Sequence, residues 1–296
     1  MVAKRVFFIV SIALIAASLS LFFTRGLNYG IDFVGGTLIE VRTDGPADIA
    51  ALRAQLGGLG LGDVSLQEFG DPRDVLIRIQ KQDGGEEAQQ EVVEVVRAAL
   101  GDAVEYRRVE FVGPTVSEEL FRDGLYAVGA AMLAMLVYIW FRFEWQFSIA
   151  AIIALVHDVI TTIGIFALFQ FDFNLSTVAA VLTIAGYSIN DTVVVFDRVR
   201  ENLRKYKAMP LQTLFDKSIN DVLSRTVITS TTTLLALLAL YILGGEVIRG
   251  FSFAMIWGVL IGTYSSICVA VPVLIYMNLR SAPVGEPTPA AEAPAE

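Results

Sequence analysis

Hydrophobic residues gather into six long runs along the chain, and shorter polar segments separate the runs. A helix needs about 20 mostly apolar residues to cross a lipid bilayer. The runs therefore predict six membrane-spanning helices, at Val6–Phe23, Leu125–Phe141, Phe147–Phe169, Leu175–Phe196, Val222–Leu243 and Phe251–Met277. A secretory signal is the alternative for the first run, but that run is longer than the usual signal core. We interpret it as a retained membrane anchor.

A different pattern fills the segment between the first two runs, from Asn28 to Glu118. Alternation of apolar and polar residues predicts four strands, and helical spacing with Gly and Asp end signals predicts two helices. In chain order these elements are strand Thr37–Arg42, helix Pro46–Gly57, strand Val64–Phe69, strand Val75–Ile79, helix Glu86–Leu100 and strand Val104–Val112. The order βαββαβ is typical of a ferredoxin-like unit. The predicted fold class is an α-helical polytopic membrane protein with six transmembrane helices and an inserted α+β ferredoxin-like domain.

Basic residues set the expected orientation, because cytoplasmic loops of membrane proteins are enriched in Lys and Arg. Lys4 and Arg5 precede the first span, and a basic cluster runs from Arg198 to Lys217 between the fourth and fifth spans. Both signals place the two termini in the cytoplasm and the inserted domain outside it. The expected divisions are residues 1–27 (N-terminus and first helix), 28–118 (extracytoplasmic domain), 119–280 (helices two to six) and 281–296 (a disordered cytoplasmic tail rich in Pro, Ala and Glu).

Composition narrows the function. Hydrophobic residues make up 55% of the chain and charged residues only 18%, and the net charge is −9. The segment 28–118 holds 17 acidic and 8 basic residues, so the whole negative charge can be assigned to it. An acidic chain of this kind is unsuited to nucleic acid. The single cysteine, Cys268, excludes a disulfide scaffold. The inserted domain has no His, nucleophile or metal cluster, so we expect neither an enzyme nor a metal or organic cofactor.

Charged residues inside the predicted spans are the main functional candidates, because a charge within a bilayer is costly. Asp191 lies beside Asn190 in the fourth span and Arg225 lies in the fifth. Thr183, Tyr187 and Asp191 are four residues apart and share one helix face; Arg225, Thr229 and Thr233 do the same. The acid and the base lie at similar depth. These two polar stripes favour a hydrated proton path, and a static ion pair between two helices is the alternative.

His157 and Asp158 in the third span are secondary candidates. Adjacent residues point about 100° apart on a helix, so we expect them not to serve one site directly, and a hydrogen bond to a neighbouring helix is the simpler interpretation. A metal-dependent or intramembrane hydrolase would need further ligands or a nucleophile that the spans lack. In the sixth span, Gly258 and Gly262 predict close helix packing, and Pro272 predicts a kink.

Several short motifs go beyond these physical patterns. They are Gly30–Thr37 (GIDFVGGT), His157–Val159 (HDV), Gly186–Thr192 (GYSINDT), Phe196–Asn202 (FDRVREN), Ser224–Thr226 (SRT), Thr229–Ser230, Gly244–Gly245 and Gly250–Ser252 (GFS). Together they closely resemble the SecF family, the smaller subunits of the bacterial SecDF protein-translocation accessory complex in the RND superfamily. The resemblance runs from the first span to the end of the sixth.

The resemblance implies a function and partners. SecF supplies one six-helix half of a twelve-helix pair with SecD, and the complex uses the proton gradient to assist secretion after the ATP-driven SecA step. It works in the lipid bilayer beside the SecYEG channel, often with YidC, on a secreted polypeptide. The coupling ion is the proton, with no other cofactor. The family's membrane acid falls on Asp191, its essential arginine on Arg225 and a neighbouring hydroxyl on Thr229.

Gly35 and Gly36 lie where the first span joins the first long strand, and backbone freedom there favours a hinge; a simple tight turn is the alternative. Two other functions remain open. An RND-type exporter of lipids or small molecules would need a larger outer domain with a substrate cleft. A purely structural assembly subunit would use Asp191 and Arg225 only to hold helices together.

Overall fold

The computed structural model describes residues 4–82, 84–277 and 279 of the chain. Six helical segments are long and apolar enough to span a membrane, which confirms the predicted number of spans. They are α1 (Lys4–Arg25), α5 (Pro114–Arg142), α6 (Trp145–Phe169), α7 (Leu175–Lys205), α8 (Leu211–Leu243) and a sixth built on α9 (Glu246–Ser265). The predicted tail at residues 281–296 lies outside the described residues.

Several helices run further than the apolar runs that predict them. Helix α5 begins at Pro114, well before Leu125, and α7 continues past Phe196 to Lys205. Helix α8 begins at Leu211 rather than Val222. A hydrophobic run marks only the part of a helix that meets lipid, whereas the polar ends continue as helix in water.

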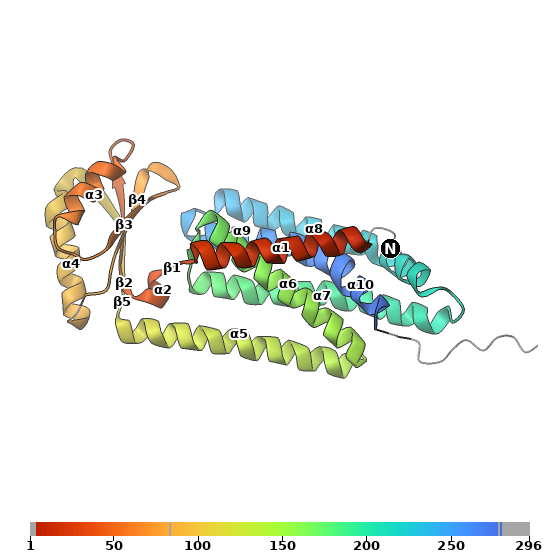
Figure 1. Cartoon of the computed structure of the whole chain (residues 1–296). Coiled ribbons are helices and arrows are strands. Elements are labelled where there is room, and N and C mark those ends of the chain that lie inside the picture. Colours follow the sequence, from red (N-terminus) through yellow and green to blue (C-terminus); the bar gives the residue numbers. More distant parts are fainter. Residues whose placement is uncertain (1–3, 83, 278, 280–296) are drawn as a thin grey trace, which may run out of the picture.

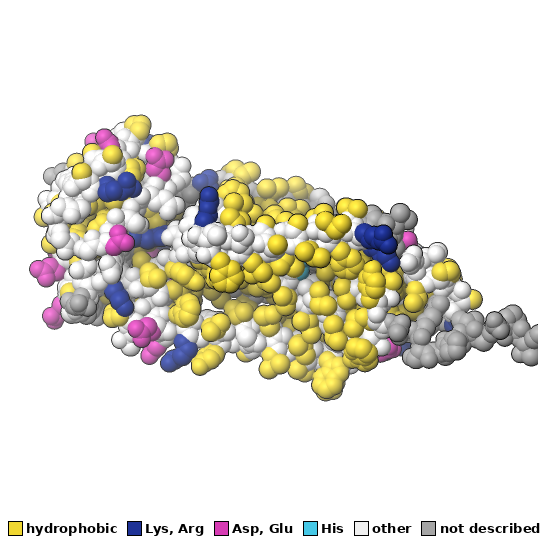
Figure 2. All heavy atoms as spheres, in the orientation of Figure 1, with side chains coloured by type: hydrophobic (Ala, Val, Ile, Leu, Met, Phe, Trp, Pro, Cys, Tyr) yellow, Lys and Arg dark blue, Asp and Glu magenta, His cyan; other side chains and the backbone are white. Residues whose placement is uncertain are grey.

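The helices lie side by side as a bundle, with the inserted domain at one end (Figure 1). The N-terminus lies at the opposite end, and α5 runs along one side of the bundle. Figure 2 shows apolar side chains over the visible face of the helical part, with charged side chains gathered on the inserted domain and at the far end. This distribution is that of a multi-pass membrane protein with one water-exposed domain.

The inserted domain is a four-stranded antiparallel sheet with two helices, in the predicted order βαββαβ. The elements are β2 (Gly36–Thr43), α3 (Ile49–Gly57), β3 (Val64–Phe69), β4 (Asp71–Ile79), α4 (Gly85–Leu100) and β5 (Val104–Val112). The spatial strand order is β3-β4-β2-β5. Apolar side chains on one sheet face pack against the helices, among them Ile39, Val41 and Ile77 against Leu56 and Val96. This core holds the domain together through apolar burial.

A short latch ties the domain to the bundle. Strand β1 (Asn28–Tyr29) pairs in parallel with β6 (Asp172–Phe173) in the connection between α6 and α7. The Nδ2 atom of Asn28 donates to Asp172 Oδ1 at 3.0 Å, and Arg78 of β4 contacts both residues, by a 2.8 Å hydrogen bond to Asn28 and an ion pair with Asp172. The domain is therefore fixed to the third and fourth spans as well as to the two spans that enter and leave it.

The sixth span is not a regular α-helix. Helix α9 passes into a π-helical turn, η2 (Ser266–Ala270), and then into α10 (Val271–Ile275). Pro272 lies at the start of α10. A proline removes one backbone hydrogen bond and clashes with the preceding turn, and a π-bulge is one way to relieve both. The predicted irregularity at Pro272 thus takes the form of a widened turn just before it.

The bundle interior depends on small residues, as expected for the sixth span. A Cβ atom added at Gly258 would collide with Ile184 of α7, and one at Gly262 would lie 3.1 Å from Cβ of Ser188. Close approach of this kind lets van der Waals packing hold helices together where lipid supplies no hydrophobic drive. Helices α7 and α9 are therefore closely packed at the level of the polar residues of α7.

Candidate functional site

Asp191 is a buried carboxyl group on α7, with only 4% of its surface exposed. Thr263 of α9 is its side-chain hydrogen-bond partner, and the second oxygen, Oδ2, has no hydrogen-bond partner among the described residues. A buried carboxyl oxygen without a partner is unusual, because most buried polar groups are satisfied. The arrangement leaves one acceptor position of Asp191 available for a proton or a water molecule.

A line of hydroxyl groups leads from Asp191 across three helices. The hydroxyl of Thr263 lies 2.7 Å from that of Ser230 in α8, and the Tyr187 hydroxyl lies 3.4 Å from the same Ser230 oxygen. Hydroxyl groups both donate and accept hydrogen bonds. The line therefore connects the Tyr187 hydroxyl to Asp191 through groups that each can donate and accept.

Within the described residues, Arg225 does not pair directly with Asp191, although counting residues along the two helices places both at a similar depth. It lies on an exposed face of α8 and interacts electrostatically with Asp191, but the two form no direct ion pair in the described part of the chain. The hydroxyl of Thr229 donates to the Arg225 backbone carbonyl at 2.9 Å, and that of Thr233 donates to the Thr229 carbonyl at 2.9 Å. These hydroxyls are occupied by their own helix, so the polar stripe on α8 is less available than its sequence indicates.

Two other expected residues also lie on the bundle surface. Asn190 is exposed, and so is Thr183, whose hydroxyl donates to the backbone carbonyl of Ala179 at 2.8 Å. The polar side chains of α7 therefore point in two different directions. Asp191 and the hydroxyl of Tyr187 face neighbouring helices, whereas Thr183 and Asn190 face outward.

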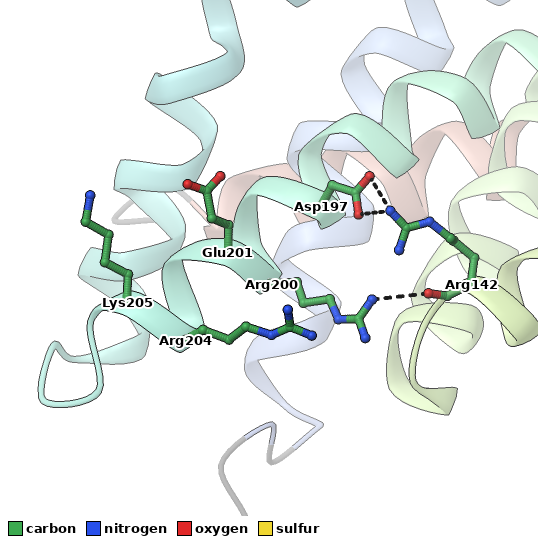
Figure 3. Close-up of a pocket in the computed structure, with 6 residues that line it drawn as sticks. All are labelled: Arg142, Asp197, Arg200, Glu201, Arg204 and Lys205. Atoms are coloured by element: carbon green, nitrogen blue, oxygen red, sulfur yellow. Dashed lines mark hydrogen bonds and ion pairs between the residues drawn. The ribbon is translucent and has the colours of Figure 1, made fainter.

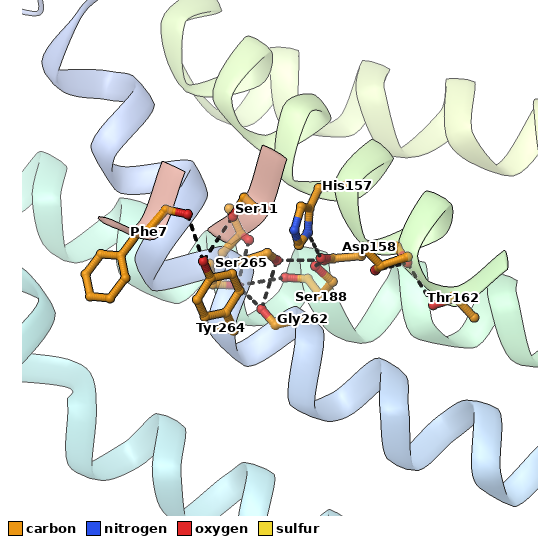
Figure 4. Close-up of polar contacts among 12 residues, drawn as sticks. Phe7, Ser11, His157, Asp158, Thr162, Ser188, Gly262, Tyr264 and Ser265 are labelled. Atoms are coloured by element: carbon orange, nitrogen blue, oxygen red, sulfur yellow. Dashed lines mark hydrogen bonds and ion pairs between the residues drawn. The ribbon is translucent and has the colours of Figure 1, made fainter. Parts of the chain in front are cut away.

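A second polar cluster surrounds His157 and Asp158 of α6, which are 1% and 0% exposed (Figure 4). The Nδ1 atom of His157 lies 2.9 Å from Asp158 Oδ1, so the adjacent side chains do meet. Ser188 of α7 and Ser265 of α9 each donate to Asp158 Oδ2 at 2.6 Å. One carboxyl group thus joins three helices close to the level of Asp191.

The cluster extends toward the first helix and the π-helical turn. The Tyr264 hydroxyl donates to the Phe7 carbonyl at 3.0 Å and lies 3.0 Å from the Ser11 hydroxyl of α1 (Figure 4). Thr192 of α7 lies 2.9 Å from the hydroxyl of Ser266, the first residue of η2. These contacts connect α1, α6, α7 and the sixth span, and they make the cluster a structural centre of the bundle.

The glycine motif after the first span contacts the helix that carries Asp191. The backbone N–H of Leu175, at the start of α7, donates to Asp32 Oδ2 at 2.9 Å. A carboxylate at a helix N-terminus accepts a hydrogen bond from a free backbone N–H, and the helix dipole stabilises its negative charge. Gly35 and Gly36 follow with φ of +72° and +115°, and a Cβ at Gly36 would collide with the carbonyl oxygen of Ile79. Glycine is therefore required at Gly36 by both backbone angle and space.

Several partners in these networks are not identified by sequence reasoning alone. Thr263 and Ser265 are hydroxyl residues in an apolar run, where such residues are common, whereas Ser188 and Ser230 lie inside the motifs Gly186–Thr192 and Thr229–Ser230 but the sequence does not indicate which groups they contact. Asp32 lies inside the motif Gly30–Thr37, but its role depends on a contact with Leu175, which is 143 positions further along the chain. Among the residues that the structure describes, no group of three or more His, Cys, Asp or Glu side chains is placed to hold a metal ion.

Six spanning helices with ionisable groups buried between them, joined to one folded domain, are the construction of a multi-pass membrane transport component. A family model described as protein export membrane protein SecD/SecF, C-terminal, matches residues 92–280, and a model of the SecD/SecF GG motif matches residues 20–47. The chain belongs to the SecD/SecF family of protein-export membrane proteins, among the SecF translocase subunits.

Its relatives are similar over nearly their whole length. Protein translocase subunit SecF of Cereibacter sphaeroides is 50% identical over 286 residues, which cover 94% of this chain and 88% of the relative. The SecF of Vibrio alginolyticus is 43% identical and covers 94% and 89%. A crystal structure of SecDF from Thermus thermophilus superimposes with a TM-score of 0.85 at 37% identity, over 94% of this chain. The chain spans only 38% of the length of that SecDF protein.

Proposed function

We propose that the chain is the SecF half of a proton-driven SecDF complex that assists protein secretion across the bacterial cytoplasmic membrane. In this proposal proton passage between the helices moves the outer domain, which acts on a polypeptide after the ATP-driven SecA step, beside SecYEG and often YidC. The observation that carries it is the position of Asp191: buried, in a hydroxyl line, with one oxygen free of partners. A group placed to take up and release a proton needs these properties.

The exposed polar residues support a SecD partner. Arg225, Asn190 and Thr183 lie on outward faces of α7 and α8, within segments that cross the membrane. A charged or amide side chain facing lipid is costly, so a second protein surface is expected to cover them. The SecDF structure that this chain matches is a longer chain, of which the match covers 38%. A SecD half would supply both the missing cover and a partner for Arg225.

In this proposal the proton gradient supplies the energy for the cycle. Each proton that crosses the membrane releases about 2.3 kcal/mol per 100 mV. The positive charge of Arg225 is close enough to attract the carboxyl group of Asp191 electrostatically. Movement of α8 relative to α7 would change this attraction, and proton binding would in turn favour one helix arrangement.

The link from helix to domain runs through the latch and the glycine motif. Asp32 caps α7, and β1 pairs with β6 just before α7 begins. A shift of α7 along its axis would therefore reach the domain directly, without passing through α1 or α5. Gly35 and Gly36 then serve as the joint between the short helix α2 (Ile31–Val34) and the sheet, and their backbone angles are ones that other residues avoid.

The proposal includes the orientation and the fold of the domain. The antiparallel order β3-β4-β2-β5 with two helices supports a ferredoxin-like unit, and the basic segment Arg198–Lys217 supports a cytoplasmic position for the opposite end. A reporter fused after Gly84 is expected to be active only outside the cytoplasm, and one fused after Lys207 only inside. Activity of both fusions on one side would refute this topology.

The central experiment replaces Asp191 by Asn, which keeps the shape and hydrogen-bonding capacity but cannot ionise. With SecD in proteoliposomes or inverted vesicles, we expect Asp191→Asn to be expressed and assembled normally and to lose gradient-dependent secretion. Asp191→Glu should keep part of the activity because its acid still titrates. Asp123→Asn, the same change at an exposed acid of α5, is the matched control.

Full gradient-dependent secretion by Asp191→Asn would reject the proton role and leave the structural-subunit alternative. Loss of assembly with SecD would instead show that Asp191 holds helices together. Activity of the complex toward small molecules or lipids, with no effect on secretion, would favour the exporter alternative.

A further inference from the structure

A hollow of about 400 Å³ lies at the end of the bundle opposite the outer domain, between the end of α5 and the last turns of α7 (Figure 3). Four cationic and two acidic side chains line it: Arg142, Asp197, Arg200, Glu201, Arg204 and Lys205. None of these residues takes part in the polar networks around Asp191 or Asp158. The hollow is therefore a separate feature with its own chemistry.

Both carboxylates are already engaged by arginine. The two oxygens of Asp197 accept from Arg142 at 2.7 and 3.0 Å. Glu201 accepts from Arg198, which lies outside the hollow, at 2.7 Å. The opposite charges of an ion pair largely cancel, so the cations outside these pairs determine the charge that an entering molecule meets.

The remaining arginines are poorly neutralised. Arg200 donates from Nη1 to the Arg142 backbone carbonyl at 3.3 Å, while its Nε atom is buried without a partner. Within the described part of the chain, no hydrogen bond or ion pair involves Arg204. Arg200 and Arg204 are four residues apart, so their like charges share one helix face and repel each other. An anion between the two guanidinium groups would relieve the repulsion and satisfy the free donors (Figure 3).

The surroundings indicate the source of such an anion. Trp140 and Phe141 at the end of α5 are 61% and 86% exposed, and Trp145 at the start of α6 is 56% exposed. Exposed aromatic side chains at the end of a spanning helix mark the boundary between lipid tails and head groups. Helix α5 itself is hardly covered by the rest of the chain. The mouth of the hollow thus lies where phospholipid phosphates are found.

We infer that this hollow binds the phosphate of an anionic phospholipid head group, with Arg200 and Arg204 as the main contacts and Trp140 and Phe141 against the acyl chains. Planar guanidinium groups pair with phosphate oxygens in two-point contacts, and basic pockets between spanning helices are known to bind such head groups. A lipid held there would fill the angle between α5 and α7. The inference depends on the fold and not on the proposed proton cycle.

The test measures lipid binding directly. The full-length chain is purified in a neutral detergent and titrated with phosphatidylglycerol, and bound lipid is counted by native mass spectrometry. We expect one tightly retained phosphatidylglycerol per chain. Arg200→Gln/Arg204→Gln should weaken its retention at least tenfold. The control Arg5→Gln/Lys207→Gln removes the same charge from two exposed positions that do not line the hollow and should leave retention within about twofold.

Two further arms use the wild-type chain, so they decide the question even if the glutamine variant does not fold. Phosphatidylcholine, which has no net charge, should be retained at least tenfold more weakly than phosphatidylglycerol. Inorganic phosphate at millimolar concentration should not displace the lipid. Equal retention of both lipids, equal loss in the control variant, or displacement by free phosphate would each overturn the assignment to an anionic lipid.

Discussion

Replacement of Asp158 tests whether its carboxyl group holds three helices together. Asp158→Ala removes the acceptor for Ser188 and Ser265 and the contact with the His157 ring. Asp158→Asn keeps one oxygen in place. If that oxygen faces the two serines, the amide group faces His157 Nδ1 and the ring must move its proton to Nε2, which is buried and has no partner. The two substitutions therefore remove different numbers of contacts from one site.

The expected magnitudes follow from these contacts. A hydrogen bond between membrane helices contributes about 0.6 kcal/mol on average and about 1.7 at most. The two contacts to Ser188 and Ser265 cross between helices and give about 1 to 3.5 kcal/mol, and the His157 contact within α6 adds about 1 kcal/mol, so the range for Asp158→Ala is about 2 to 4.5 kcal/mol. Ser265 also donates to the Gly262 carbonyl at 3.1 Å and keeps that partner, so we expect the lower half of the range, about 2–3 kcal/mol. Asp158→Asn should cost about 1 kcal/mol, the usual loss for one buried hydrogen bond.

The chain carries its own reporter for the measurement. Cys268 is the single cysteine, it lies in the π-helical turn beside the cluster, and it is buried. Labelling of Cys268 by a thiol-reactive dye in micelles of rising SDS content follows unfolding of the bundle and gives its free energy. Asp123→Ala, at an exposed acid of α5, is the control and should change the free energy by less than about 0.5 kcal/mol.

A cost below about 0.5 kcal/mol for Asp158→Ala would refute the reasoning, because three buried contacts would then contribute nothing net. A double-mutant cycle with Ser188→Ala sharpens the test. Coupling between the two substitutions should be about 0.6–1.7 kcal/mol, whereas additive effects would show that the 2.6 Å contact is not energetically linked to stability.

Three further predictions concern other parts of the molecule. Arg225→Met should abolish gradient-dependent secretion and Arg225→Lys should retain part of it, since lysine keeps the charge but not the planar fork; normal secretion by the Met variant in inverted vesicles would exclude a need for the charge. Gly36→Ala should destabilise the outer domain by at least about 3 kcal/mol, because the collision with Ile79 adds to backbone strain of about 1–3 kcal/mol. Gly35→Ala should cost less, since its added Cβ meets no atom closer than 3.2 Å. Urea unfolding followed by dye labelling of a Val96→Cys reporter in a Cys268→Ser chain measures both, and equal costs would contradict the structure. The same assay should show a pH effect. Arg42 donates to both oxygens of Asp74 at 2.6 Å and lowers the pKa of that carboxyl group. The stabilisation by this ion pair is therefore present above the ordinary pKa of about 3.9 and is lost as pH falls through the lowered value. Asp74→Asn should flatten this acid dependence, and an unchanged profile would argue against it.

The spans and the domain elements can be predicted because each depends on a local pattern. A run such as Phe147–Phe169 is long enough to cross a bilayer whatever its neighbours are, and the strand Val104–Val112 follows from its residue types and alternation. The ends of α7 and α8 cannot be predicted in the same way, since polar residues continue a helix in water without a hydrophobic signal. The two-residue strands β1 and β6 are unpredictable because their pairing joins positions 144 residues apart.

The candidate site is predictable in its charges but not in its contacts. Asp191, His157 and Asp158 stand out because acids and imidazoles are rare in apolar runs. Depth along a helix follows from residue count, which is why Asp191 and Arg225 can be placed at one level. The direction in which each side chain points depends on how the helices are rotated against one another. That rotation turns Arg225 outward and brings Ser188 and Ser265 to Asp158. It cannot be predicted from a single sequence.

The latch between the outer domain and the bundle limits how far this molecule can be rebuilt from interchangeable parts. Residues 28–113 look like a cassette inserted between α1 and α5, yet Asn28 and Arg78 contact Asp172 in the connection before α7, and Asp32 contacts the first residue of α7. A chimaera that exchanged only this cassette with that of a distant relative would place foreign partners opposite Asp172 and the first N–H of α7. Functional exchange should therefore require residues 170–175 to travel with the cassette, so the unit of modular exchange is discontinuous in the chain.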